Sequence, residues 1–506
     1  MGKYLLGIDL GTSACKIAVF SREGEIIATA AKDYRVYYPR EHWAEQNPDE
    51  WWIAICEGIK EALLHAKINA KEIAGIGVDG QSWSSVAIDK TGNVLVNTPI
   101  WMDTRASKIC DRLNKQIGSE KIFKVSGNSL QPSYTTAKII WYKENLPHMY
   151  KNIDKILQSN SFIVFRLTGI CSQEKSQGYG LHCFGNKEGV WDDDMCRLLG
   201  IERQMLPDIY ECHHVVGTLT KEAAEQTGLF SGTPVVAGGL DAACGTLGAG
   251  VIHDGETQEQ GGQAGGMSIC MDTYHADPRL ILSCHVVEGK WLLQGGTTGG
   301  GGIMRWLERE FGAYEREIGK EQHKSSLELF NEAAEKIAPA SDGVVFLPYM
   351  SGERSPIWDI HAKGVYYGLD FSKTKAHMIR AAMEGVAYAL KHNLEVAKEA
   401  GAKVDVLRAM GGSANSLLWT QIKADITKKP IAVPAADTAT TLGAAILAGV
   451  GTGVYKDFQE AVDLTVHIKR EHAPNLEHEQ QYDKNYKIYR ELYDNLKGIM
   501  KENQNA

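Results

Sequence analysis

The strongest constraint on the fold lies in residues 4–20, whose sequence is YLLGIDLGTSACKIAVF. An apolar run ends on Asp9, passes through the small residues Gly11, Thr12 and Ser13, and then becomes apolar again. This pattern predicts a β-hairpin whose buried first strand carries one carboxylate to the turn. Backbone N–H groups and hydroxyls in such a turn can hold a phosphate, with magnesium bridging from the carboxylate. The alternative is an ordinary hairpin in which Asp9 and Thr12 satisfy their own backbone.

Composition is that of a soluble globular protein of two or three domains. The chain has 506 residues, of which 43% are hydrophobic and 23% charged. The net charge is -9 with Lys and Arg scattered, so neither nucleic acid nor a membrane is expected as a partner. No apolar stretch reaches the roughly 18 residues of a membrane span. The ten cysteines form no C-x-x-C pair, which indicates reduced thiols, and we expect a cytoplasmic protein.

A second strand and turn follow at residues 73–89, IAGIGVDGQSWSSVAID. The middle of this segment is both polar and aromatic, with Asp79, Gln81, Ser82, Trp83 and Ser84 close together. Hydroxyl groups of a ligand need hydrogen-bond partners, while an indole face packs against a carbon skeleton. The segment therefore predicts a binding site for a small polyol.

The segment TPIWMDTRA, residues 98–106, brings Trp101, Asp103 and Arg105 close to a predicted helix start at Thr104. A second tryptophan beside charged groups favours a substrate-facing role for Trp101 and Asp103. The alternative is that Asp103 caps the helix and pairs with Arg105.

A further lone acid, Asp241, ends an apolar strand in residues 234–250, PVVAGGLDAACGTLGAG. Glycines around it let other groups approach the backbone closely. Two strand-end carboxylates suit a site in which Asp9 mainly holds magnesium and Asp241 removes a proton. The alternative is that Asp241 caps a helix that begins near Ala242.

Two glycine-rich segments occupy residues 259–270 and 292–307. They are too rich in glycine for the interior of a helix or strand, and neither continues as a Walker P-loop. We expect them to let a nucleotide lie flat on the backbone; the alternative is a flexible linker. The run of four glycines at 299–302 is a candidate hinge.

Helical periodicity is strong in the last third of the chain. Residues 373–400 predict a long core helix, and the small residues of 438–454 suit close helix packing. Tyrosines of 482–493 line one face of a terminal helix that we expect to pack on the body. In contrast, residues 171–191 lack a pattern, so we expect a surface excursion or a lid there.

These motifs together resemble the FGGY family of carbohydrate kinases. The resemblance rests on GIDLGTS, the Trp-x-Asp-x-Arg element, GGLDAACG, the glycine-rich segments, FLPYMSGERSP, GGSANS and TTLGAAILAG, and covers residues 4–455. Residues 364–384, GVYYGLDFSKTKAHMIRAAME, fit the family's C-terminal signature throughout. Within the family, the overall pattern is most similar to the xylulokinase-like members.

The resemblance implies an α/β protein of two ribonuclease-H-like domains, of the actin and Hsp70 type, that close on a cleft. Residues 1–247 would form the sugar-binding domain, 248–455 the nucleotide-binding domain, and 456–506 a helical extension. ATP and magnesium would be the cofactors, with a sugar as substrate and a homodimer left open.

The resemblance also implies roles for single residues. Asp9 would orient magnesium through water, and Asp241 would be the base, close to both metal and sugar. The turn at Gly11, Thr12 and Ser13 would touch phosphates. The residues implied on the nucleotide side are Gly262, Gly301, Gly302, Gly411, Gly412 and Asn415.

Two departures from the family pattern affect the expected substrate. Gly262 is followed by Gln263 where many relatives have threonine, so no threonine contact to phosphate is expected. Xylulokinases typically carry Gln-Met-His-Gly where this chain has Gln81, Ser82, Trp83 and Ser84. We expect a ketopentose such as xylulose, with another polyol, a hexulose or gluconate as alternatives. A different class, an actin-like or Hsp70-like ATPase clamp without a sugar, stays open because fold alone does not decide function.

Overall fold

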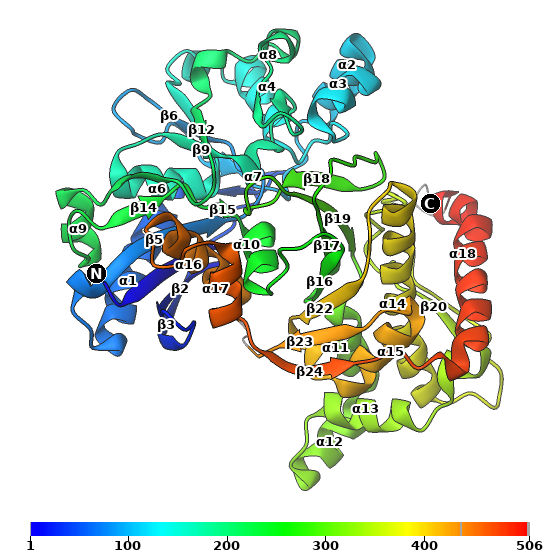
Figure 1. Ribbon diagram of the computed structural model, residues 1–506. Coiled ribbons are helices and arrows are strands. Elements are labelled where there is room, and N and C mark those ends of the chain that lie inside the picture. Colours follow the sequence, from blue (N-terminus) through cyan, green and yellow to red (C-terminus); the bar gives the residue numbers. More distant parts are fainter. Residues whose placement is uncertain (1, 436–437, 503–506) are drawn as a thin grey trace. The chain divides into compact units, whose positions relative to one another are not determined.

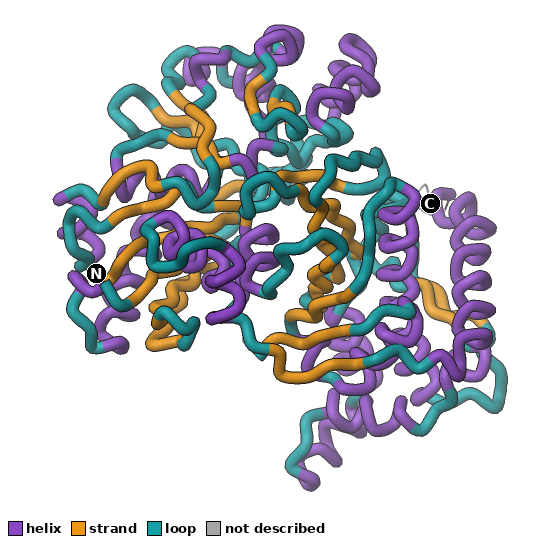
Figure 2. Tube along the Cα trace, in the orientation of Figure 1, coloured by secondary structure: helices purple, strands orange, loops and turns teal. Residues whose placement is uncertain are grey.

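The computed structural model describes residues 2–435 and 438–502, which form two compact α/β units (Figures 1 and 2). Unit 1 comprises residues 2–252, 270–292 and 438–467, and unit 2 comprises residues 253–269, 293–435 and 468–502. The two-domain α/β class predicted from the sequence is confirmed. All ten cysteines are free thiols, nine of them buried, as expected.

Unit 1 is built on a mixed sheet with the strand order β13-β14-β5-β1-β2-β3, and β15 also pairs with β5. The strands are β1 (Tyr4–Leu10), β2 (Ala14–Ser21), β3 (Ile26–Asp33), β5 (Ile73–Gly80), β13 (Val215–Thr218), β14 (Pro234–Val236) and β15 (Gly239–Leu240). β1 runs antiparallel to β2 and parallel to β5. The N-terminal hairpin predicted from residues 4–20 is therefore confirmed.

Side chains of β1 alternate between the two faces of this sheet. Leu6, Ile8 and Leu10 belong to a buried apolar cluster that includes residues of α1 (Pro48–Ala66). Asn47 caps α1 by accepting a hydrogen bond from the Asp49 amide. Gly7 and Asp9 face the other side, where α16 (Ala439–Gly451) and α10 (Asp241–Gly248) pack.

Glycines bring α16 unusually close to the sheet. A Cβ atom on Gly7 would lie 2.0 Å from the Thr441 carbonyl oxygen, and one on Gly77 would lie 1.8 Å from that of Ala444. The prediction that this small-residue segment packs closely is confirmed. The sequence-based boundaries group 438–455 with the nucleotide-binding domain, whereas its contacts join it to the sheet of unit 1.

Unit 1 also contains short helices and strands outside this sheet. Its other helices are α2 (Ser107–Leu113), α3 (Ser119–Ser126), α4 (Thr135–Asn145), α5 (Pro147–Tyr150), α6 (Ser159–Thr168), α7 (Lys175–Gly178), α8 (Asp193–Leu199), α9 (Lys221–Thr227) and α17 (Phe458–Thr465). Its short strands are β4 (Glu45–Gln46), β6 (Val86–Ile88), β7 (Thr98–Pro99), β8 (Lys155–Leu157), β9 (Ser172–Glu174), β10 (Phe184–Gly185), β11 (Val190–Trp191), β12 (Asp208–Tyr210) and β18 (Ile281–Cys284).

The expected surface lid at residues 171–191 is wrong. Most of this segment is buried, and it forms β9, α7, β10 and β11. Glu174 and Gln177 are fully buried and hydrogen-bonded to other polar groups. A polar network of this kind leaves no apolar periodicity in the sequence, which is why the pattern seemed to be lost.

Unit 2 holds a second mixed sheet in which β19, β17, β16, β22, β23 and β24 are successive neighbours. These strands are β16 (Glu256–Gly261), β17 (Gly265–Met271), β19 (Trp291–Thr297), β22 (Val406–Met410), β23 (Ile431–Pro434) and β24 (Ile468–His472). A further pair is β20 (Val345–Leu347) with β21 (Val365–Tyr367). The helices are α11 (Gly301–Phe311), α12 (Ala313–Gln322), α13 (Ser326–Glu335), α14 (Lys375–Glu399), α15 (Leu417–Thr427) and α18 (Glu479–Glu502).

Two expectations about unit 2 are confirmed and one is wrong. The predicted core helix is α14, and the tyrosine face of α18 packs into the core of unit 2 through Tyr482 and Tyr489. The glycine-rich segments, however, do form strand interiors, since Gly265 lies in β17 and Gly295 in β19. A Cβ on Gly265 would lie 2.7 Å from the Thr297 Cγ2, so close strand packing accounts for that glycine.

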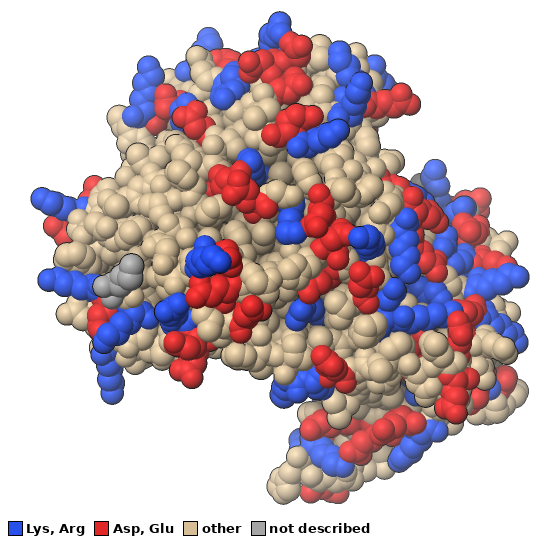
Figure 3. Space-filling view, viewed as in Figure 1, with Lys and Arg blue, Asp and Glu red and all other residues tan. Residues whose placement is uncertain are grey.

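The surface carries both signs of charge. Lys, Arg, Asp and Glu are interspersed over the face shown in Figure 3, in agreement with the scattered charges of the sequence. No helix within residues 2–435 and 438–502 combines the length and apolarity that crossing a membrane requires.

We predict that Gly77→Ala destabilises unit 1. The added methyl would overlap the Ala444 carbonyl, and such overpacking against backbone should lower the free energy of unfolding by about 2–3 kcal/mol. Chemical denaturation followed by circular dichroism measures this loss. The control is Gly498→Ala in α18, where a Cβ meets no atom within 4 Å and should stabilise the helix by about 0.5–1 kcal/mol. Equal midpoints for both variants would contradict the prediction.

Candidate functional site

Three acidic residues meet at the end of the unit 1 sheet. Asp9 in β1 lies directly beside Asp79 in β5, and Gly239 of β15 pairs with Asp79 from the other side. Asp241 follows two residues later, as the first residue of α10. The parallel strands thus bring together both predicted strand-end acids, and they add a third acid, Asp79, which the sequence places in the predicted polyol-binding segment.

Electrostatics confirms that the three carboxyl groups interact. Burial raises the pKa of Asp9, which the positive charge of Lys16 partly offsets. Burial and repulsion from Asp9 raise the pKa of Asp241 to about 7, and the Ala242 amide lowers it by donating a hydrogen bond of 2.6 Å. Burial, followed by repulsion from Asp9 and Asp241, holds the pKa of Asp79 well above its usual range. A positive charge or a proton at this position would relieve the repulsion.

Asp79 is fully buried, and the hydrogen bond of its carboxyl group among the described residues is shared with the neighbouring acid Asp9. A buried carboxyl that pairs only with a second acid is costly, so its retention indicates a function or a missing partner. The sequence does hold a signal for it: Asp79 ends an apolar strand in the same way as Asp9 and Asp241.

The alternative that Asp241 caps its helix is not observed. The N-cap position of α10 is Leu240, and no side chain caps that end. Asp241 keeps part of its surface accessible. It is therefore free to contact a ligand.

The turn after β1 is connected to the second predicted site. Trp101 Nε1 donates to Thr12 Oγ1 at 2.9 Å, and Gln46 Nε2 donates to the Thr12 carbonyl at 2.7 Å. Gln46 in turn accepts a hydrogen bond of 2.7 Å from Gln81 Nε2. Ser13 is exposed at the tip of the turn, beside Gly11. This chain of contacts holds Thr12, Trp101 and Gln81 together within unit 1.

The turn after β5 is strained and carries unused polar atoms. Trp83 has a φ of 58°, a left-handed conformation that is rare for a bulky residue and occurs most often at functional sites. Its ring stacks on Tyr134 with centroids 4.1 Å apart. Among the described residues, Gln81 Oε1, Trp83 Nε1 and Ser84 Oγ are buried without a hydrogen-bond partner, and the Tyr179 hydroxyl donates to Ser82 Oγ at 3.4 Å. Gln81 Oε1 is an acceptor, Trp83 Nε1 is a donor, and Ser84 Oγ can act as either, and such atoms suit the hydroxyl groups of a ligand.

Asp103 matches one half of the alternative expectation: it pairs with Arg105 but does not cap the following helix. Its carboxylate accepts hydrogen bonds from the Arg105 guanidinium and from the Ala44 amide at 2.7 Å, all in the interior. The predicted pairing with Arg105 is confirmed, whereas capping is wrong because α2 begins at Ser107 without a side-chain cap. Direct contact of Asp103 with substrate stays a prediction.

Lys138 links the segment of Trp83 to the segment of Trp101 through its buried amine. Its buried amine donates to the carbonyl oxygens of Trp83 at 2.8 Å and of Ile100 at 2.7 Å. Burial lowers the pKa of Lys138 to about 7, although the negative charge of Asp103 opposes this. Lys138 thus fixes the backbone beside Trp83 and Trp101.

The glycines predicted on the nucleotide side converge in unit 2. The Gly301 amide donates to the Gly262 carbonyl at 2.7 Å, and the Gly302 amide donates to that of Gln263 at 3.0 Å. A Cβ on Gly411 would lie 3.0 Å from the Gly261 carbonyl, while one on Gly412 would meet open space. Gly262, Gly301 and Gly411 therefore lie close together, although they are far apart in sequence.

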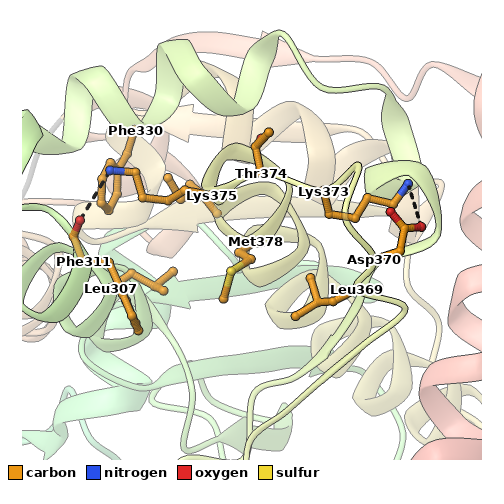
Figure 4. A pocket seen from close by; sticks show the side chains of 10 residues that line it. Leu307, Phe311, Phe330, Leu369, Asp370, Lys373, Thr374, Lys375 and Met378 are labelled. Atoms are coloured by element: carbon orange, nitrogen blue, oxygen red, sulfur yellow. Dashed lines mark hydrogen bonds and ion pairs between the residues drawn. The ribbon is translucent and has the colours of Figure 1, made fainter.

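Next to them is a small pocket of about 50 Å³, whose lining includes Gly411, Asn415 and Arg470. A larger pocket of about 290 Å³ lies elsewhere in unit 2, beside the start of α14 (Figure 4). It is mostly apolar, and its Lys375 and Lys373 are already engaged by Glu315 and Asp370. No residue predicted to bind a ligand lines this larger pocket.

The acidic residues fit a cation only in part. Among the described residues, no group of three or more His, Cys, Asp or Glu has the geometry to hold a metal ion by itself. Asp9 and its neighbour Asp79 offer oxygen ligands of the type that magnesium prefers, and magnesium usually keeps several waters. The site therefore fits an ion that is held through water and through ligand phosphates.

Comparison with known proteins adds independent information. The model of the FGGY family of carbohydrate kinases, N-terminal domain, matches residues 4–248, and that of the C-terminal domain matches residues 274–452. The xylulose kinase of Bacillus subtilis is 29% identical over 499 residues, covering 98% of each chain. The gluconokinase of Bacillus licheniformis is 29% identical over 486 residues, covering 96% of this chain and 94% of that relative.

A solved structure shows the same architecture. The xylulose kinase from Rhodospirillum rubrum matches with a TM-score of 0.90 and 27% identity, covering 98% of this chain and 99% of that one. The resemblance predicted from the motifs is thus confirmed by both domain models, which together match well over half of the sequence. The chain belongs to the FGGY family of carbohydrate kinases.

Proposed function

We propose that this carbohydrate kinase transfers the γ-phosphoryl group of ATP to a hydroxyl of a small ketose, with a ketopentose such as xylulose as the first candidate. The observation that carries the proposal is the juxtaposition, within unit 1, of acidic Asp9, Asp79 and Asp241 with a turn of unused polar atoms at Gln81–Ser84. An acid cluster suits phosphoryl transfer, and the turn suits a polyol.

Asp241 is the proposed base. Its pKa of about 7 lets the carboxylate exist at neutral pH and still accept a proton from the attacking hydroxyl. Asp9 is the proposed residue that orients magnesium through water, with Asp241 also near the ion. When bound, the ion would neutralise charge on the phosphoryl oxygens.

Nucleotide contacts are proposed for each unit by itself. The turn at Gly11, Thr12 and Ser13 would touch phosphates, with the amides of Thr12 and Ser13 as donors, because the Gly11 amide already donates to the Ala14 carbonyl at 3.1 Å. In unit 2 the convergent glycines Gly262, Gly301 and Gly302 would allow close approach. Gly411, Gly412 and Asn415 would contact adenine, which the adjacent pocket supports.

The proposed sugar contacts are Gln81, Ser82, Trp83, Trp101 and Asp103, with Asp241 at the reacting hydroxyl. The unused atoms of this turn are neutral, which favours a neutral ketose over a sugar acid. A carboxylate would need a free cation, whereas Lys138 and Arg105 are engaged by protein groups. The gluconokinase relative keeps gluconate as the alternative substrate. The free thiols support a cytoplasmic location.

Release of ADP across a panel of ketoses, polyols and aldonates tests the proposed function. We expect a ketopentose to raise the rate well above the background ATPase, because its hydroxyls match the neutral turn. A response to gluconate alone would move the substrate to the sugar acids. No response to any sugar would instead favour the ATPase clamp and contradict the kinase proposal.

Asp241→Asn tests the proposed base. The amide cannot accept a proton, so we expect kcat to fall by about 10²–10⁴-fold while ATP affinity stays within about twofold. Steady-state kinetics measures kcat, and calorimetric titration measures the affinity for ATP. Asp208→Asn at an exposed strand position of the same unit is the control. Turnover close to that of the parent would remove Asp241 as the base.

Trp83→Ala tests the sugar pocket. Loss of the ring should raise the KM for the sugar by about tenfold, or about 1.4 kcal/mol, and should alter sugar preference. Trp83→Phe keeps stacking on Tyr134 but removes the Nε1 donor, so it separates packing from hydrogen bonding. Unchanged KM and preference in both variants would exclude Trp83 from the pocket.

A further inference from the structure

A buried acid, Glu174, lies at the centre of a hydrogen-bond network in unit 1. Glu174 ends β9, has no exposed surface, and caps the short helix α7. Its Oε2 atom accepts from the Ser176 amide and the Ser176 hydroxyl, both at 2.6 Å, and from the Gln177 amide at 3.1 Å. Asn160 Nδ2 donates to Oε1 at 3.3 Å, and Cys212 Sγ donates to Oε2 at 3.4 Å.

One arm of this network reaches the residue before Asp241. The Ser176 hydroxyl donates its proton to Glu174, so its oxygen is left to accept from a backbone amide. That amide belongs to Leu240, at 2.9 Å. The Glu174 carboxylate therefore sets the direction of the hydroxyl that holds Leu240, and with it the start of α10.

The other arm reaches the turn at Gln81–Ser84. Gln177 Nε2 donates to the carbonyl oxygens of Gly80 at 3.1 Å and of Gln81 at 3.3 Å. At the other end of α7, Tyr179 contacts the Trp83 ring with centroids 5.7 Å apart and donates to Ser82. A helix of four residues thus touches both the turn and the strand that leads to Asp241.

A helix cap alone does not account for this arrangement. Exposed Ser, Thr, Asn or Asp residues cap helices without the desolvation penalty of a buried carboxylate. Across residues 2–435 and 438–502, no ion pair with lysine, arginine or histidine involves Glu174, so hydrogen-bond donors alone stabilise it. A buried carboxyl group held only by oriented donors specifies one geometry of the groups around it.

We propose that Glu174 is a positioning residue that fixes the Gln81–Ser84 turn and Asp241 at a set distance from each other, acting through Gln177 and Ser176. The proposal rests on the proposed function, in which this turn binds the sugar and Asp241 accepts its proton. The action of Glu174 then has two parts. Through Ser176 it controls the chemical step, and through Gln177 it controls sugar binding.

The test compares kinetics of four variants of the full chain. In either orientation of its amide, Glu174→Gln places an NH2 group against donors that now face a carboxylate oxygen, either those of residues 176 and 177 at Oε2 or those of Asn160 and Gln177 at Oε1, and we expect kcat/KM for the sugar to fall by about 10²-fold. Glu174→Asp, which keeps the carboxylate, should recover most of this loss. Ser176→Ala should lower kcat by about tenfold with the sugar KM within twofold, and Gln177→Ala should raise the sugar KM by about tenfold with kcat within threefold.

The matched control is Asp192→Asn, which also neutralises a carboxylate at a helix N-cap in unit 1, where Asp192 accepts from the Met195 amide at 2.7 Å. Its kcat and KM should equal those of the parent. ATP affinity should stay unchanged in all variants, which separates positioning from general loss of structure. If Glu174→Gln fails to fold, the contrast between Ser176→Ala and Gln177→Ala still tests the proposal.

Two outcomes overturn the inference in distinguishable ways. An active parent whose Ser176→Ala and Gln177→Ala variants keep parental kcat and KM, or lose both equally, would refute the positioning role alone. A parent without sugar-dependent ADP release would refute the proposed function, and this inference with it.

Discussion

Parallel pairing of β1 with β5 is the constraint on which the rest of unit 1 depends. In this register Asp9 lies beside Asp79, and Gly7 lies beside Gly77. The two glycines admit α16 against the sheet, since any Cβ there would overlap the helix backbone. α16 then supports α10, which begins with Asp241. Packing of a glycine pair and placement of an acid pair are thus consequences of one strand register.

Electrostatics sets the pKa values of the acids at this end of the sheet, and hydrogen bonds hold the backbone around them. Burial, followed by the charge of Asp9, raises the pKa values of Asp79 and Asp241, because burial removes the water that would screen these carboxylates. Such repulsion is tolerated where a cation or a transferred proton relieves it. The backbone near the acids is held instead by side chains whose hydrogen bonds stay within the protein. Lys138 donates to the Trp83 carbonyl, and Glu174 accepts from the Gln177 amide.

Sequence patterns anticipated most of the regular structure and the main site. The hairpin, the core helix α14 and the tyrosine face of α18 follow from apolar periodicity. Where periodicity is absent, prediction failed: residues 171–191 seemed to be a lid and are buried. Parts of the glycine-rich segments, which we did not expect inside a helix or strand, lie in β17 and β19, because close packing, rather than flexibility, requires those glycines.

The sequence by itself determined the acids at strand ends, the polar and aromatic turn, the glycine motifs and, through them, membership of the FGGY family. Local patterns suffice for these features because each is encoded within some twenty residues. Only the tertiary structure decided which polar groups satisfy one another. It engages Asp103 with the Ala44 amide, Asp79 with Asp9, and Glu174 with donors of Asn160 and Cys212, since hydrogen-bond partners distant in sequence are chosen by strand register and packing.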